Sequence, residues 1–356
     1  MNTLIKNWWK DIDGFSLLGF LILMIIGIIL SFSINDQTIY FQKHLIYSLL
    51  SVIIFLFLSL LERKTIRRLA LIGLLISIVA MVAILFMNYE VNGAKRWLKL
   101  WSGMSLQPSE FLKPCFFVIS AWFLSKGIEG QKIALYIVFI FFLFLTTLLI
   151  FQPDFGMTML FAVTFFCQLF IAGLSIALVG LALILLTLLF ISAYYFIEHV
   201  NIRVQTWVKH FFDPDPFSQI TSSLNCFKSG GLFGKGPGQG ICKEKLPEAN
   251  TDFIFAVAGE EFGLIVCCII VFLFLIIIIR ILLKLLKIDN PFIIIAIIGL
   301  ICCFGLQALI NIFSSLDLIP TKGMTLPFIS YGGSSMLSTA ILVGFLLSLT
   351  KKRNNE

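Results

Sequence analysis

The sequence LPEANTDFIFAVAGEEFG, residues 246–263, carries acidic side chains across the boundary between a polar loop and a long apolar segment. Asp252 lies at the mouth of the apolar segment, and Glu260 and Glu261 lie inside it. Carboxylates within a hydrophobic span are costly to bury, so they mark candidate functional sites. On a helix, Glu260 lies about 12 Å deeper than Asp252 and about 80° around the axis. We therefore expect Asp252 to be placed for chemistry and the glutamate pair to hold helices together through buried polar contacts.

The composition of the whole chain is that of an integral membrane protein. Of its 356 residues, 59% are hydrophobic, only 13% are charged, and 38 are phenylalanine. Such a chain does not supply the polar surface of a soluble domain. The net charge of +7 comes from basic residues spread over short loops rather than from a continuous basic face. We therefore predict no nucleic-acid partner.

Apolar runs of about twenty residues predict ten transmembrane helices in an all-α polytopic membrane protein. An even number places both termini on one side, and more than half of the basic residues fall in short segments on that side, which makes it cytoplasmic. Residues 1–356 are predicted to form a single membrane domain, with a long outer loop, about 199–252, between helices 7 and 8. The predicted spans begin near Phe15, His44, Leu69, Ser109, Ile133, Gly156, Ser175, Phe253, Phe292 and Leu326.

The outer loop contains a glycine-rich segment, GGLFGKGPGQG at residues 230–240, which we call the glycine loop. It does not match a nucleotide-binding phosphate loop, because Lys235 is followed by Gly236 rather than by serine or threonine. Glycine permits positive φ and close approach of another backbone, and successive N–H groups can bind an anion. A pyrophosphate site and a plain mobile loop are both open. Cys226 and Cys242 share the outer loop, either as free thiols or, less favoured, as a disulfide.

Basic and aromatic residues gather in a second outer segment, NGAKRWLKL at residues 92–100. Lys95, Arg96 and Lys99 lie next to Trp97, against the positive-inside trend. One interpretation is anchoring at the headgroup level, for which tryptophan and long cationic side chains are suited. The other is a phosphate site, in which Arg96 would form bidentate hydrogen bonds.

Acidic residues also lie at two other span entrances. Glu110 and Lys113 are three residues apart in QPSEFLK and share a helix face, so a structural ion pair is the first interpretation and a substrate contact by Lys113 the second. Asp154 follows Gln152-Pro153 and is placed to cap the next helix. Capping of span 8 is likewise the alternative role of Asp252.

The last outer motif is LIPTKGMTLPFISYGGSS, residues 318–335. Its density of proline, glycine and serine beside a span predicts a non-helical entry. Such an entry is tolerated at membrane depth only where it is buried in protein or lines a cavity. A hydrophobic groove with a polar rim would follow, and this arrangement suits a lipid-linked substrate.

These outer motifs together resemble the SEDS family of cell-wall proteins. GAKRW, QPSEFLK, QPDFG, the glycine loop, the 246–263 stretch and PTKGMTLPFISYGGSS occur in the family's order over nearly the whole chain. PTKG and the GPG of the glycine loop are more similar to the division member than to the elongation member. Two departures are Asn250, where many members have histidine, and Lys95, where arginine is frequent.

The resemblance implies a peptidoglycan glycosyltransferase that polymerises lipid II into undecaprenyl-linked glycan at the outer face of the cytoplasmic (inner) membrane, at the division septum. Its implied partners are a class B penicillin-binding transpeptidase and other membrane proteins of the division complex. The implied catalytic residue is Asp252. No protein ligands for a metal are predicted, and a divalent cation, magnesium or manganese, is left open. The predicted substrate-binding residues are Trp97, Arg96, Lys95, Lys113, Glu110, Gly231, Lys322, Ser330 and Tyr331; the predicted supporting residues are Glu260, Glu261 and Asp154. Two other functions compete with this one: a transporter that flips lipid II, and a non-catalytic scaffold that activates the transpeptidase.

Overall fold

The computed structural model describes residues 8, 11–34, 38–87, 96–99, 105–173, 198–212, 218–320 and 323–351, with isolated positions between 180 and 195. Its only sheet in this part of the chain is a two-stranded antiparallel one, β1 (Leu98–Lys99) with β2 (Ser105–Leu106). The helices are α2 (Gly14–Ser33), α3 (Thr38–Leu60), α4 (Arg63–Phe86), α5 (Pro108–Ile128), α6 (Lys132–Phe151), α7 (Phe155–Ile171), α9 (Glu198–Phe212), α10 (Gln219–Gly230), α11 (Cys242–Lys245), α12 (Ile254–Leu285), α13 (Pro291–Ser315) and α14 (Gly333–Leu349).

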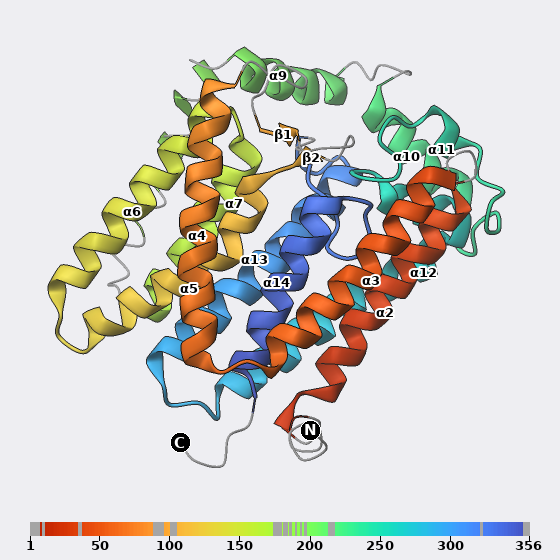
Figure 1. Cartoon of the computed structure of the whole chain (residues 1–356). Helices are drawn as coiled ribbons and strands as arrows, with labels where there is room; N and C mark the ends of the chain where they lie inside the picture. The colour runs from red at the N-terminus through yellow and green to blue at the C-terminus, as the bar shows by residue number, and fades with distance from the viewer. Residues whose placement is uncertain are drawn as a thin grey trace.

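The long helices run side by side in a bundle whose two ends differ (Figure 1). One end carries α9, the β1–β2 hairpin, α10 and α11, and we call it the capped end. At the opposite end α2 begins and α14 ends, and we call it the terminal end.

The core of the bundle is formed by α5, α13 and α14, which bury most of their residues. Around them α3, α4, α6 and α12 turn large apolar side chains outward, among them Ile53, Ile76, Ile140 and Phe272. A soluble protein rarely exposes apolar patches of this extent, whereas lipid is a suitable neighbour for them. Together with the length of the helices, this surface makes the chain a multi-pass membrane protein.

Most predicted spans are present among the described residues. Seven helices are long and apolar enough to cross a membrane, and α7 and α14 are shorter apolar helices. These correspond to nine of the ten predictions. The span predicted to begin near Ser175 lies outside the described residues, apart from the isolated positions between 180 and 195.

Several predicted boundaries are wrong. α3 and α4 begin at Thr38 and Arg63, about six residues before the predicted starts, because polar residues near their beginnings, Gln42 and Lys43 in α3 and the basic first turn of α4, are helical although they are not apolar. α14 begins at Gly333 rather than near Leu326, because the segment before it is the non-helical entry that its proline and glycines predict. The predicted outer loop is also not a plain loop, since it contains α9, α10 and α11.

Candidate functional site

The helix that follows Asp252 is broken at Gly263, which has φ +78° and ψ −180°. A break deprives backbone groups on either side of their helical partners. The glycine loop supplies new ones: the Lys235 N–H donates to the Glu260 carbonyl (3.0 Å), and the Leu264 N–H donates to the Gly231 carbonyl (3.0 Å). The glycine loop therefore bridges the break in α12. We call the glycine loop, α11 and the Glu260–Glu261 pair that bonds to them the splint.

The glycines of this loop are required by close approach to α12. A Cβ on Gly230 would overlap the Gly259 carbonyl, and one on Gly234 would overlap the Glu261 carbonyl. Gly231, predicted to bind substrate, follows α10 with a positive φ of 58°. The sequence left open whether this loop binds pyrophosphate or is simply mobile; its N–H groups at 235 and 236 are instead bonded to α12.

The side chain of Glu260 organises the start of α11. Its carboxylate is fully buried, and Oε1 accepts hydrogen bonds from the N–H groups of Ile241 (2.9 Å) and Cys242 (3.0 Å). The Lys235 ammonium lies 3.1 Å from the same oxygen. A buried charge satisfied by several donors of the same fold is a structural element rather than a reactive group.

Glu261 connects three helices. Its carboxylate lies 2.7 Å from the Lys243 ammonium of α11 and accepts a hydrogen bond from the Ser33 hydroxyl at the end of α2. Lys243 also donates to the Ser33 carbonyl. The pair Glu260 and Glu261 thus makes the buried polar contacts between helices that the sequence predicts for it.

One group in the described part of the chain has the composition of a metal site. The ligand atoms of Cys226, Cys242 and Glu260 lie within 4.8 Å of one another. Two thiols and a carboxylate do not suit magnesium or manganese, which prefer oxygen ligands, and Glu260 is already bonded by three donors. Both cysteines are free thiols. Burial, with Cys242 and Glu260 nearby, raises the pKa of the Cys226 thiol well above its usual range.

Asp252 lies one residue before the N-cap position of α12. The helix begins at Ile254, and Phe253 rather than Asp252 occupies the N-cap position. Asp252 itself is half-buried, and a Cβ on Gly323 would lie 3.4 Å from its Oδ2 atom. Its carboxyl group therefore faces the non-helical entry to α14.

The backbone around Asp252 is clamped from two sides. α13 contributes the Asn311 side chain, and the entry to α14 contributes Ser330 and Tyr331. The carbonyls of Asn250, Thr251 and Asp252 accept hydrogen bonds from the Tyr331 N–H (2.9 Å), the Ser330 hydroxyl (2.5 Å) and the Asn311 amide (2.8 Å), in that order. Asn311 also donates to the Met324 carbonyl (2.6 Å). The 246–263 stretch and the 318–335 motif thus form one unit.

Polar side chains continue from Asn311 into the core, and we call Lys113, Gln307 and Asn311 the α13 ladder. Gln307 lies one turn from Asn311; its oxygen accepts from the Lys113 ammonium (2.8 Å) and its amide donates to the Thr325 carbonyl (3.1 Å). Lys113 is 1% exposed and lies 2.8 Å from Glu110 Oε2. The predicted ion pair is therefore present, and Lys113 is buried within the fold.

Sequence reasoning missed Gln307 and Asn311. Their signal was available, because two amide side chains four residues apart inside an apolar span share one helix face. It missed His44 as well. This ring is fully buried beside Tyr331, with centroids 6.2 Å apart, and neither nitrogen has a hydrogen-bond partner within the described residues.

The guanidinium of Arg96 is bound to the turn before α7. It donates to the carbonyls of Gln152 (3.2 Å) and Pro153 and lies 3.6 Å from Asp154. Asp154 also accepts from the Gln107 amide (3.2 Å) and caps α7, as predicted. Arg96 therefore uses its bidentate geometry on the protein itself.

The remaining predicted substrate-binding residues that the structure describes lie near the capped end. Trp97 is half-buried and Lys99 is exposed, both at the β1–β2 hairpin. Tyr331 packs edge-on against Tyr40, with ring centroids 5.3 Å apart. Lys95 and Lys322 lie outside the described residues.

Comparison with known families matches almost the whole chain to one model. The model for the cell cycle proteins of the FtsW, RodA and SpoVE group covers residues 11–355. A probable peptidoglycan glycosyltransferase FtsW of Caulobacter vibrioides is 38% identical, over 99% of this chain and 92% of that protein. A protein with the same description from Coxiella burnetii is 34% identical, over 98% and 96%.

Solved structures share the fold. One, described as "Structural coordination of polymerization and crosslinking by a peptidoglycan synthase complex", superposes with a TM-score of 0.78 at 23% identity and covers 95% of this chain and 97% of its own. The rod shape determining protein RodA of Thermus thermophilus gives a TM-score of 0.71 at 22% identity, over 96% and 97% of the two chains. At these identities the likeness establishes the helical architecture.

Proposed function

The chain belongs to the FtsW, RodA and SpoVE family of cell cycle proteins, and on that premise we propose that it is a peptidoglycan glycosyltransferase of the division type. Its substrate in this proposal is lipid II, which it polymerises at the outer face of the inner membrane, at the septum. The choice of this site rests on the hydrogen bonds that hold the backbone of residues 250–252. They keep the half-buried carboxylate of Asp252 at the end of a membrane helix.

In the proposed reaction Asp252 accepts the proton of the acceptor sugar's 4-hydroxyl group. The oxygen of that hydroxyl forms a bond to the anomeric carbon of the lipid-linked donor, and the bond from this carbon to undecaprenyl pyrophosphate breaks. Cationic side chains stabilise the negative charge that develops on the leaving group. Lys95, Arg96 and Lys99 are assigned this task, and Arg96 also binds the turn before α7.

An aspartate in water is a weak base, with a pKa near 3.9. Proton transfer to Asp252 therefore needs an environment drier than water. A bound lipid-linked donor excludes water from the carboxylate, and desolvation raises the pKa of a carboxyl group. A second role for Asp252, orienting the acceptor or a divalent cation, is distinguished by the experiment below.

The test is polymerisation of lipid II by the purified protein with its transpeptidase. Asp252→Asn removes the base while keeping the shape of the side chain, so the rate should fall by about 10²- to 10⁴-fold, the usual contribution of a general base. Glu248→Gln, at an exposed acid of the same segment, should retain the rate. Full activity of Asp252→Asn would contradict the catalytic assignment. A chelator added to the wild type shows whether a divalent cation takes part.

The proposed partner is a class B penicillin-binding transpeptidase within the division complex. A scaffold that only recruits this enzyme predicts that Asp252→Asn leaves growth and complex formation intact. If the protein is instead a lipid II transporter, the wild type should move lipid II across vesicle membranes without polymerising it. Asp252→Asn should then lose this translocation. The sequence of α12 favours an enzyme over a transporter. Glu260 and Glu261 are followed by apolar residues as far as Ile279, whereas a transporter needs polar residues that continue across the membrane.

A further inference from the structure

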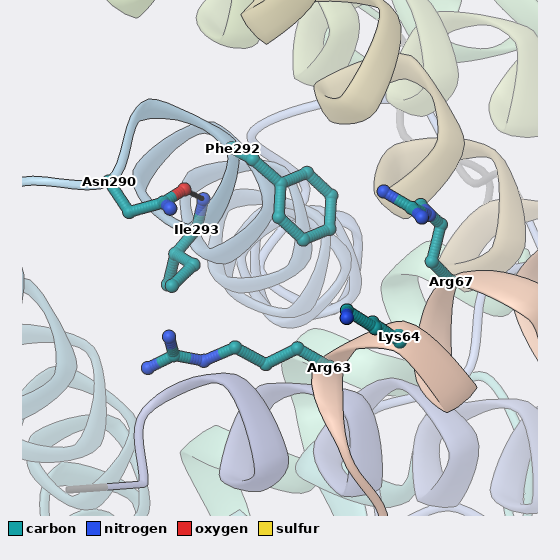
Figure 2. A pocket seen from close by; sticks show the side chains of 6 residues that line it. All are labelled: Arg63, Lys64, Arg67, Asn290, Phe292 and Ile293. Atoms are coloured by element: carbon teal, nitrogen blue, oxygen red, sulfur yellow. Dashed lines mark hydrogen bonds between the residues drawn. The ribbon is translucent and has the colours of Figure 1, made fainter. Parts of the chain in front are cut away.

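A cavity of about 160 Å³ lies at the terminal end of the bundle, between the first turns of α4 and α13. Figure 2 shows the six side chains around it: Arg63, Lys64 and Arg67 from α4, and Asn290, Phe292 and Ile293 from the start of α13. The Asp252 segment precedes α12 at the opposite end (Figure 1). The cavity is therefore separate from the candidate glycosyltransferase site.

The electrostatic potential of this cavity is positive from several sources. Three of its six lining residues are cations and none is acidic; the acids nearest in sequence, Glu62 and Asp289, are exposed. Two helices also begin here, and the N–H groups of a first helical turn carry partial positive charge that favours anions. The Asn290 side-chain oxygen caps the Ile293 N–H (3.4 Å), so its amide nitrogen can serve as a donor.

A neighbouring tryptophan holds one of these cations. The Arg67 guanidinium lies 4.9 Å from the centre of the Trp122 ring, and the Lys126 ammonium lies 4.6 Å from the same ring. Tryptophan is also typical of the membrane–water interface.

The surface beside the cavity is apolar. Leu71 and Leu75 follow Arg67 at intervals of four residues, so they share its face of α4, and their side chains are 44% and 51% exposed. Phe292 and Ile293 make part of the cavity wall apolar as well. A ligand with a charged head and hydrocarbon chains fits this surface better than a soluble anion does.

We propose that this cavity binds the phosphate group of an anionic membrane phospholipid, whose acyl chains lie along Leu71 and Leu75 of α4. Arg63, Lys64, Arg67 and the first turn of α13 contact the phosphate. The proposal does not depend on the proposed glycosyltransferase function.

The test is native mass spectrometry of the full chain in detergent with phosphatidylglycerol or phosphatidylcholine. Wild type should bind phosphatidylglycerol in preference. The triple variant Arg63→Gln, Lys64→Gln, Arg67→Gln should lose about a hundredfold in affinity for it, since each basic residue near an anionic lipid contributes about fivefold. The matched control is Arg68→Gln, Lys132→Gln, Lys287→Gln, which removes the same charge from exposed residues outside the cavity. It should change the affinity by less than about fivefold.

Because Arg67 also packs on Trp122, a milder variant guards against misfolding: Lys64→Gln, at an exposed residue, should lose about fivefold. Equal loss in the two triple variants would mean diffuse surface charge and would overturn the proposal. Unchanged binding by Lys64→Gln would overturn it too. Displacement of the lipid by inorganic phosphate at equal concentration would show that the cavity takes a soluble phosphate, which contradicts the lipid assignment.

Discussion

The capped end contains two polar centres that use buried charge in opposite ways. In the splint, the carboxylates of Glu260 and Glu261 are fully buried, and ammonium, hydroxyl and N–H groups of the same fold surround them. In the α13 ladder, the buried Lys113 ammonium is held by Glu110 and Gln307, and the Asn311 amide holds the Asp252 carbonyl, so that the carboxylate of Asp252 is half-buried at the helix end. The first arrangement stabilises a broken helix; the second positions the carboxylate that we propose as the catalytic base.

The largest effect should come from the splint. Glu261→Leu leaves the Lys243 ammonium buried without its partner, which costs about 3–5 kcal/mol when one member of a buried pair is removed. Thermal unfolding in detergent measures the loss. The double variant Glu261→Leu, Lys243→Leu should recover much of it, because no unpaired charge remains. A double variant as unstable as the single one would show that the ion pair is not what holds α11 to α12.

The backbone of the splint can be tested without changing charge. In Gly263→Ala, a positive φ and overlap with the Leu232 carbonyl should together cost about 2–3 kcal/mol. Gly238 is the matched control, because it has the same φ of +78° and a Cβ added there would have no atom within 4 Å. Gly238→Ala should therefore cost only about 1 kcal/mol, from backbone strain alone. Equal losses, compared by the same unfolding measurement, would mean that contact between the glycine loop and α12 contributes nothing.

The sequence predicted the ladder and the splint unequally well. Helical phase and depth were enough to separate Asp252 from Glu260 and Glu261, because these depend only on local helix geometry. The ion pair of Glu110 with Lys113 followed from spacing in the same way. Local features of this kind can be predicted before any tertiary contact is known.

The break at Gly263 could not be predicted. Gly263 lies in an apolar run that reads as continuous helix, and its conformation depends on the Leu232 and Gly234 backbone about thirty residues earlier. The contact of Arg96 could not be predicted for a related reason: its charge and its neighbour Trp97 suggested a membrane anchor or a phosphate site, whereas the turn to which it donates lies more than fifty residues away. Long-range backbone partners leave little trace in local composition.

The ladder should affect catalysis more than stability. Asn311→Leu removes the donor to the Asp252 and Met324 carbonyls, so stability should fall by about 1–2 kcal/mol and the rate of lipid II polymerisation by about tenfold or more. Gln168→Leu is the control: this amide is equally buried and bonds the Phe117 carbonyl at 2.8 Å, away from Asp252. It should lose similar stability and keep its rate when corrected for folded protein. Parallel loss of activity in both variants would reduce the ladder to a stabilising contact.

The smallest effect is expected at the terminal end, where the Asp13 carboxylate pairs with two cations that are partly exposed to water. Asp13 lies 3.3 Å from Arg280 and 3.2 Å from Lys284. Burial raises its pKa, but hydrogen bonds from Ser16 and Arg280 and the charge of Lys284 outweigh this and leave the pKa below its usual value. Ionised Asp13 therefore stabilises the fold above about pH 4, and this contribution is lost as the pH falls through the lowered pKa.

The loss should be at most about 1 kcal/mol, because the Arg280 side chain is 47% exposed and the pair is screened. Asp13→Asn should flatten the decline in unfolding temperature between about pH 5 and pH 3, and Asp11→Asn, which removes a neighbouring carboxylate outside this cluster, should not. If Asp13→Asn keeps the wild-type decline, the cations around Asp13 contribute nothing measurable. The strength of carboxylate–cation contacts in this protein would then depend on burial of both partners, as in the splint, and not on their number.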